Sequence, residues 1–92
     1  AGARILVLAG KGHNAGDALL AATALAARSA GARVDVVFAF GERALRPLAR
    51  RAWEPLSRSA RRARPDGADW AAEGYDLILD GVFGFQFRPP LG

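Results

Sequence analysis

The residues best suited to chemistry lie in a glycine-rich segment at positions 10–17, which reads Gly-Lys-Gly-His-Asn-Ala-Gly-Asp. Glycines let a backbone approach a ligand closely, and the first turn of a helix offers free N–H groups and partial positive charge to an anion. The glycine spacing matches neither the dinucleotide fingerprint nor the Walker motif, which disfavours a P-loop phosphotransferase. We interpret the segment as a phosphate- and ion-binding loop, with a plain strand-to-helix turn as the alternative.

A second candidate is Asp80, which is followed by Gly-Val-Phe-Gly-Phe at positions 81–85. Ligands of open parallel sheets bind outside the C-terminal ends of the strands, and both Asp80 and the glycine-rich segment follow expected strands. If those strands are neighbours, Asn14 and Asp80 face one pocket, where amide and carboxylate oxygens suit an alkali or alkaline-earth cation. The alternative is that Asp80 caps the following turn.

Other side chains give weaker indications. His13 is the only histidine, and an acid–base role, a phosphate contact and no role at all remain open. Trp53 and Trp70 are interpreted as core or lid packing, and Arg88 as a phosphate contact or a loop arginine without a role. The chain has no cysteine, which excludes a thiolate nucleophile or disulfide within it. No serine lies in a nucleophile-elbow motif.

The composition is that of an ordinary globular domain: of the 92 residues, 51% are hydrophobic and 24% charged. We expect one domain over 1–92, belonging to a longer cytoplasmic protein, with no membrane-spanning segment. The net charge is +4, and eight arginines lie between Arg43 and Arg64. We interpret this cluster as a solvated helix face, because no groove-reading or base-stacking motif accompanies it, which disfavours nucleic acid as a partner.

The hydrophobic pattern predicts an α/β order. Positions 5–9 and 34–40 predict buried strands, and the alanine-rich segment 17–29 between them predicts a helix with Asp17 at its start and Gly31 at its stop. A second helix is expected over 45–61, kinked or split by Pro55, with Leu48 on its apolar side. A turn at 64–67, a helical turn at 69–73, a strand at 76–80 and a loop at 81–92 complete the pattern. Whether a short strand precedes the turn is left open.

Two motifs together resemble the NAD(P)H-hydrate epimerase family, the YjeF N-terminal domain. Its first motif is roughly G-P/K-G-N-N-G-G-D-G, and residues 10–18 read G-K-G-H-N-A-G-D-A. Its second is roughly D-x-x-x-D-A-x-F-G, and residues 76–84 read D-L-I-L-D-G-V-F-G. Order and spacing both agree from the first strand to the end of the chain.

The resemblance implies a Rossmann-like three-layer α/β/α fold with a mostly parallel sheet, of which this chain is an incomplete segment. It implies epimerisation of the R and S forms of hydrated NADH and NADPH (NADHX and NADPHX), with a potassium ion bound by Asn14 and Asp80. Asp80 is also the candidate catalytic group. A fused ADP- or ATP-dependent dehydratase related to carbohydrate kinases and a homo-oligomeric state are further expectations. The expected substrate-binding residues are His13, Asn14, Ala15, Gly16, Asp17, Gly84, Phe85, Gln86, Phe87, Arg88, Pro89 and Pro90.

The chain departs from the motif at three positions. His13 replaces an asparagine, and Ala15 and Ala18 replace glycines, so we expect added methyl groups where the ligand approaches. The family's later segment, which carries a further aspartate for the chemistry and a serine for the ion, is expected beyond Gly92. The alternatives are a domain whose own epimerase activity is lost and a non-catalytic module that binds RNA or protein.

Overall fold

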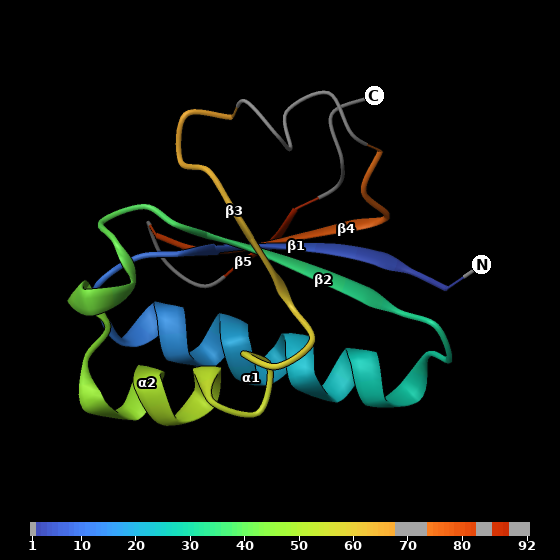
Figure 1. Cartoon of the computed structure of the whole chain (residues 1–92), viewed down its shortest axis with the longest axis horizontal. Helices are drawn as coiled ribbons and strands as arrows, with labels where there is room; N and C mark the ends of the chain where they lie inside the picture. Colours follow the sequence, from blue (N-terminus) through green and yellow to red (C-terminus); the bar gives the residue numbers. More distant parts are fainter. Residues whose placement is uncertain (1, 68–73, 83–85, 89–92) are drawn as a thin grey trace.

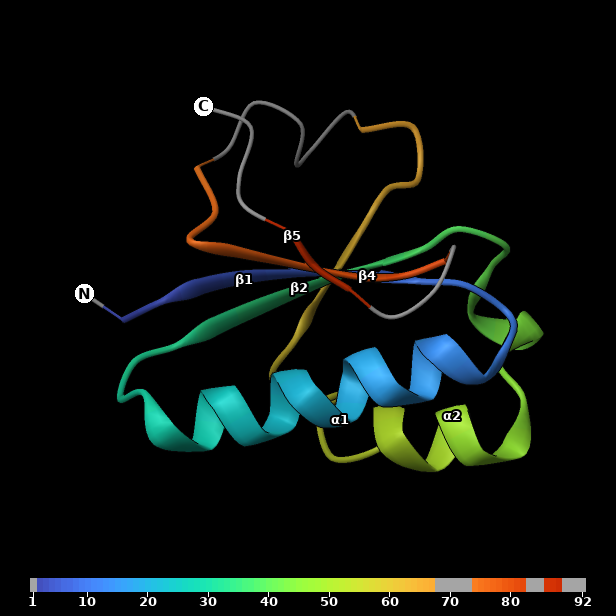
Figure 2. The ribbon, with the colours of Figure 1, turned by 180° about the vertical axis from the view of Figure 1, so that it is seen from behind.

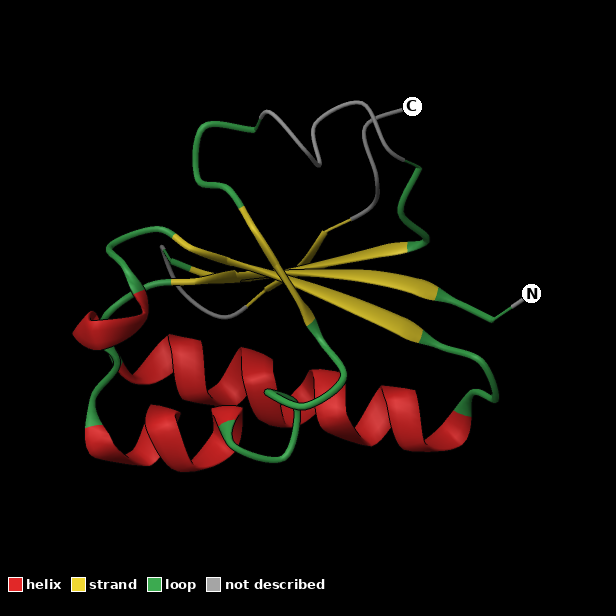
Figure 3. Cartoon of the chain, viewed as in Figure 1, coloured by secondary structure: helices red, strands yellow, loops and turns green. Residues whose placement is uncertain are grey.

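The computed structural model describes residues 2–67, 74–82 and 86–88. They form a five-stranded sheet in the order β3-β2-β1-β4-β5, with helices α1 and α2 on one face (Figures 1 and 3). In chain order the elements are β1 (Arg4–Ala9), α1 (His13–Arg28), β2 (Arg33–Phe38), the 3-10 turn η1 (Glu42–Ala44), α2 (Pro47–Trp53), β3 (Arg61–Ala63), β4 (Leu77–Gly81) and β5 (Gln86–Arg88).

The sheet is mostly parallel, as the sequence predicts. The apolar strand β1 lies in its centre and pairs in parallel with β2 on one side and β4 on the other. The strand that the sequence left open exists as β3 and pairs in parallel with β2. The expectation of a continuous loop over 81–92 is wrong in part, because Gly81 belongs to β4 and 86–88 form β5, antiparallel to β4.

Helix α1 begins at His13, four residues before the expected start at Asp17. Gly12 is the N-cap, and no acidic residue lies in the first turn, so the expected capping role of Asp17 is wrong. Glycine at position 16 costs a helix about 1 kcal/mol relative to alanine. Its bare backbone, however, packs on α2: a Cβ there would lie 3.4 Å from the Cα of Ala49. Tertiary packing therefore extends the helix through a segment whose composition is typical of a turn.

Helix α2 is shorter than expected and ends at Trp53. Pro55 accounts for this end, because it has no N–H to donate to the carbonyl of Arg51 and its ring crowds that carbonyl, whereas Glu54 keeps helical angles of φ −50° and ψ −48°. Leu45 and Trp53 are buried, which confirms the core prediction for Trp53, but Leu48 is 70% exposed. The expectation that Leu48 belongs to the apolar side is therefore wrong.

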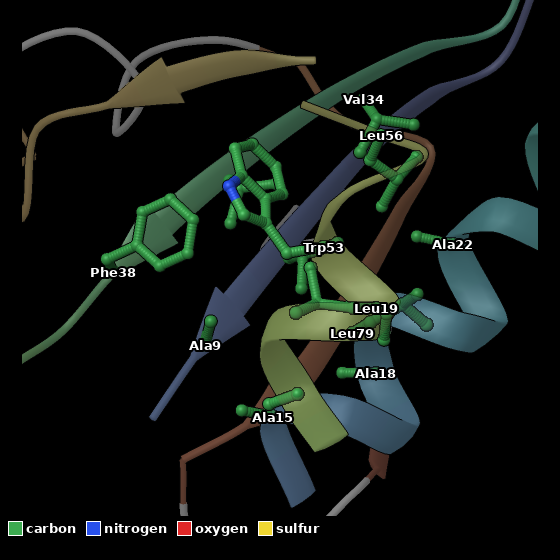
Figure 4. Close-up of a cluster of buried hydrophobic side chains, with 14 of the residues drawn as sticks. Ala9, Ala15, Ala18, Leu19, Ala22, Val34, Phe38, Trp53, Leu56 and Leu79 are labelled. Carbon is green, nitrogen blue, oxygen red and sulfur yellow. The ribbon is translucent and has the colours of Figure 1, made fainter. Parts of the chain in front are cut away.

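The main hydrophobic core lies between the sheet and the two helices (Figure 4). Figure 2 shows from behind that α1 and α2 lie on the same side of the sheet. The opposite face carries a smaller cluster of buried residues, made of Leu6, Val37, Ala63 and Tyr75. The described residues thus form the sheet and one helix layer of the Rossmann-like arrangement. Among these residues, no helix is both long and apolar enough to cross a bilayer.

Candidate nucleotide and ion site

The two motifs lie side by side at the C-terminal edge of the parallel strands, because β1 and β4 are direct neighbours. The amide of Gly10 donates to the carbonyl of Gly81 over 3.3 Å. A side chain at position 10 would collide with this strand end, since its Cβ would lie 3.0 Å from the Gly81 oxygen. The close approach of the two chain segments therefore favours glycine at position 10.

Asn14 adjoins the same strand end. A Cβ at Gly81 would lie 2.7 Å from the backbone oxygen of Asn14, so the first turn of α1 packs directly on the residue after Asp80. Asn14 is half-buried and Asp80 is buried. The structure thus brings together the backbone segments that carry the two expected ion ligands.

The carboxylate of Asp80 has a structural role in the turn. Its Oδ1 accepts a hydrogen bond from the amide of Val82 over 2.9 Å, which confirms the capping alternative. A carboxylate has about four acceptor positions on its two oxygens, so capping the turn does not use up its capacity to accept. The role in capping and a role as a ligand are compatible.

His13 and Asp17 are exposed on α1, and both line a groove of about 530 Å³ between α1 and α2. Sequence reasoning missed the α2 wall of this groove, because Leu48 and its neighbouring arginines follow an ordinary amphipathic pattern. Only the packing of the two helices shows that Leu48 and these arginines line the same groove as His13. The lining residues from the α2 side are Arg46, Pro47, Leu48, Ala49, Arg51 and Ala52.

Ala15 and Ala18 lie in the core rather than at a ligand surface. Both have 0% exposure, and Figure 4 shows them among the side chains between helix and sheet. The expectation that their methyl groups stand where a ligand approaches is therefore wrong.

The second expected substrate segment is only partly described. The backbone of Gln86, Phe87 and Arg88 forms β5, in which Gln86 is the register partner of Asp80. This pairing places the strand beside the candidate site. The remaining expected contacts, Gly84, Phe85, Pro89 and Pro90, lie outside the described residues, as does Trp70.

Several arginines of the basic cluster make contacts within the fold. Arg62 donates to Glu42 over 2.7 Å and lies over the ring of Trp53, whose indole N–H also donates to Glu42. The hydrogen bond from Arg62 lowers the pKa of Glu42 below its usual range. Arg50 donates to the carbonyl of Leu45 over 3.2 Å. Part of the cluster therefore holds η1, α2 and β3 together.

A second charged group lies at Asp35 on β2. Its Oδ2 accepts hydrogen bonds from Tyr75 over 2.6 Å and from Arg61 over 2.9 Å. Burial alone raises the pKa of Asp35, but these hydrogen bonds and the positive charges of Arg61 and Arg33 lower it below its usual range. The group stays ionised and connects β2, β3 and the start of β4.

The donor set suits a monovalent or alkaline-earth cation better than a transition metal. Within residues 2–67, 74–82 and 86–88, no three His, Cys, Asp or Glu side chains gather in a metal-binding group. Asn14 and Asp80 instead carry amide and carboxylate oxygens, the hard ligands that such cations prefer. The residues present therefore fit the expected potassium ion.

The fold and the paired motifs define the N-terminal part of a Rossmann-like α/β domain with a glycine loop at the C-terminal edge of its sheet. The family model described as "YjeF-related protein N-terminus" matches residues 1–92, and the chain belongs to this family. This confirms the resemblance that the motifs indicated.

Curated relatives share close to half of the residues. The chain is 47% identical over 92 residues to a Bordetella bronchiseptica protein and 46% identical to a Bordetella parapertussis protein, both named NAD(P)H-hydrate epimerase. An Achromobacter xylosoxidans protein of the same name is 38% identical over 95 residues. The alignments include 100% of this chain for the two Bordetella proteins and 99% for the Achromobacter protein. They include only 38% of the length of each Bordetella protein and 42% of the length of the Achromobacter protein. No solved structure matches the chain.

Proposed function

We propose that this chain is the front part of an enzyme that interconverts the R and S forms of hydrated NADH and NADPH. The observation that carries the proposal is the pairing of the two motifs, Gly10 to Gly81, at the edge of the sheet where nucleotides bind. Family membership over the whole chain and the printed names of its relatives support the same reaction.

The glycine loop and the start of α1 are suited to the dinucleotide phosphates. The helix begins at His13 without a side-chain cap on its first turn, which leaves backbone N–H groups and the positive end of the helix dipole for an anion. Asp80 is the candidate for the nicotinamide end. Loss of the hydroxyl from the hydrate leaves a cation on the ring, to which water returns on either face, and a nearby carboxylate favours that positive charge.

We further propose that Asn14 and Asp80 hold a potassium ion. The ion, when bound, supplies positive charge that fixes the geometry of the two loops. The chain's own residues then orient the substrate. A fused dehydratase, a homo-oligomeric state and a cytoplasmic location remain predictions for the whole protein.

The decisive experiment follows the R form of NADPHX in the presence of a dehydratase that uses only the S form. The whole protein should convert the R form, so that all of the hydrate is consumed. Asp80→Asn should slow the conversion strongly, whereas Asp66→Asn, at an exposed turn, should not. If the R form remains intact with the wild-type protein, the proposed reaction is wrong. RNA binding without any shift in melting temperature on adding NADP would instead favour a binding module.

A further inference from the structure

The connection from β2 to α2 contacts the end of β1 at one point and Lys11 of the glycine loop at two. The amide of Ala39 donates to the carbonyl of Ala9 over 2.9 Å. The ammonium group of Lys11 lies over the ring of Phe40, 4.8 Å from its centre. Arg46 donates from Nε to the carbonyl of Lys11 over 3.2 Å. The loop is therefore held from β2 and α2 as well as from its own strand.

The backbone of Arg46 is fixed by its neighbour. Pro47 is the first residue of α2, and a proline restricts the residue before it to extended conformations. Arg46 accordingly has φ −73° and ψ 163°. The starting direction of its side chain is thus set by the chain itself, which lowers the entropy cost of holding the guanidinium on the loop.

The carbonyl that Arg46 holds belongs to a peptide unit that matters for the loop. A peptide unit is planar and trans, so the Lys11 carbonyl and the Gly12 amide point in opposite directions. Holding the carbonyl toward α2 turns the Gly12 N–H away from α2. A hydrogen bond on the carbonyl also polarises the N–H and improves it as a donor. Gly12 is the N-cap of α1, where the proposed function places a phosphate.

We propose that Arg46 is a positioning residue: it holds the Lys11–Gly12 peptide so that the glycine loop is preformed for the phosphates of the substrate. This inference rests on the proposed function for the identity of the ligand. The holding of the loop can be tested without any ligand. Arg46 is exposed like several other arginines of the basic cluster, and the hydrogen bond to the Lys11 carbonyl is what distinguishes it.

Two substitutions separate the hydrogen bond from the charge. In Arg46→Gln, the side-chain amide nitrogen takes the place of the arginine Nε, so the bond to the Lys11 carbonyl is kept and the charge is lost. In Arg46→Lys, a methylene takes that place, so the charge is kept and the donor is lost from that position. Arg46→Ala removes both, and Arg58→Ala serves as the matched control at an exposed position of the same cluster.

The experiment measures exchange of the Gly10 and Ala15 amides, which donate to the carbonyls of Gly81 and Gly12 on either side of the held peptide, in the whole, ligand-free protein, together with KM and kcat for NADPHX epimerisation. Arg46→Ala and Arg46→Lys should exchange about threefold to tenfold faster and raise KM by about the same factor, with kcat changed less than about twofold. Arg46→Gln and Arg58→Ala should match the wild type.

If Arg46→Lys behaves as wild type and Arg46→Gln as alanine, the charge contacts phosphate directly and the proposal is wrong. Identical exchange in all variants would also overturn it. A wild type without epimerase activity would disprove the proposed function, while exchange would still decide the role of Arg46.

Discussion

A methyl group on Gly81 would lie 3.0 Å from the Cβ of Ala18, closer than two carbon atoms normally approach. The family motifs carry glycine at the position of Ala18 and alanine at the position of Gly81, the reverse of this chain. The same methyl group would lie 2.7 Å from the backbone oxygen of Asn14, so both the helix backbone and the Ala18 side chain occupy the space beside the end of β4.

This relationship predicts that the two positions are coupled. Gly81→Ala should cost about 1–3 kcal/mol by overpacking, and Ala18→Gly about 1 kcal/mol by helix propensity. The double variant should be less destabilised than the sum of the two, because the contact with the Ala18 methyl is gone, but it should stay less stable than the wild type, because the backbone oxygen of Asn14 still lies beside position 81. Urea unfolding of the whole protein measures the cycle. Ala24→Gly, at an exposed position of the same helix, should add to Gly81→Ala without coupling. If the losses of Ala18→Gly and Gly81→Ala also add without coupling, the two side chains do not compete for the same space.

Asp35 predicts a dependence of stability on acid pH. Its pKa in the folded protein is lowered, so the folded state binds the proton less readily than the unfolded chain, whose aspartates titrate near pH 4. The stability from Asp35 is therefore present above about pH 4 and is lost as the pH falls further. Asp35→Asn should cost about 1.5–3 kcal/mol at neutral pH and flatten this part of the acid curve. Asp66→Asn, in an exposed ion pair, should leave the curve as it is. An acid curve unchanged by Asp35→Asn would show that other carboxylates cause the loss.

The two leucines at the start of α2 should differ sharply. Leu45 is 4% exposed and Leu48 is 70% exposed. Leu45→Ala should therefore cost about 2–4 kcal/mol, because it leaves a cavity beside the core, whereas Leu48→Ala should change stability by less than about 0.5 kcal/mol. Thermal unfolding of the two variants makes the comparison. Equal losses would mean that Leu48 is covered in the whole protein.

Potassium should stabilise the whole protein through Asn14 and Asp80. An ion that binds only the folded state adds about 2.7 kcal/mol when its concentration is 100 times its Kd. Asp80→Asn keeps an oxygen for the Val82 amide but lowers the attraction for a cation, so the variant should stay folded and lose the difference between potassium and choline buffers. Asp76→Asn, at the other end of the same strand segment, should keep the difference in stability between the two buffers. Equal melting temperatures of the wild type in the two buffers would argue against the ion site.

Strands and parallel pairing were predictable because they follow from local composition. The apolar run of β1, the β-branched residues of β2 and the helix-forming segment between them each favour one conformation, and a strand–helix–strand order leads to a parallel sheet. The start of α1 at His13 was not predictable. The segment from His13 to Gly16 has turn-like composition, and its helical conformation and its position against α2 at Ala49 are seen only in the tertiary structure.

The sequence by itself determined the α/β class, the order of the elements β1, α1, β2, α2 and β4 and, through its two motifs, the family. The tertiary structure decided which residues meet. It put β4 beside β1, so that Gly10 bonds to Gly81. It turned Ala15 into the core rather than toward a ligand, and it placed Arg46 on the glycine loop. The physical reason is that conformational preference acts over a few neighbouring residues, whereas these contacts depend on packing between segments distant in the chain.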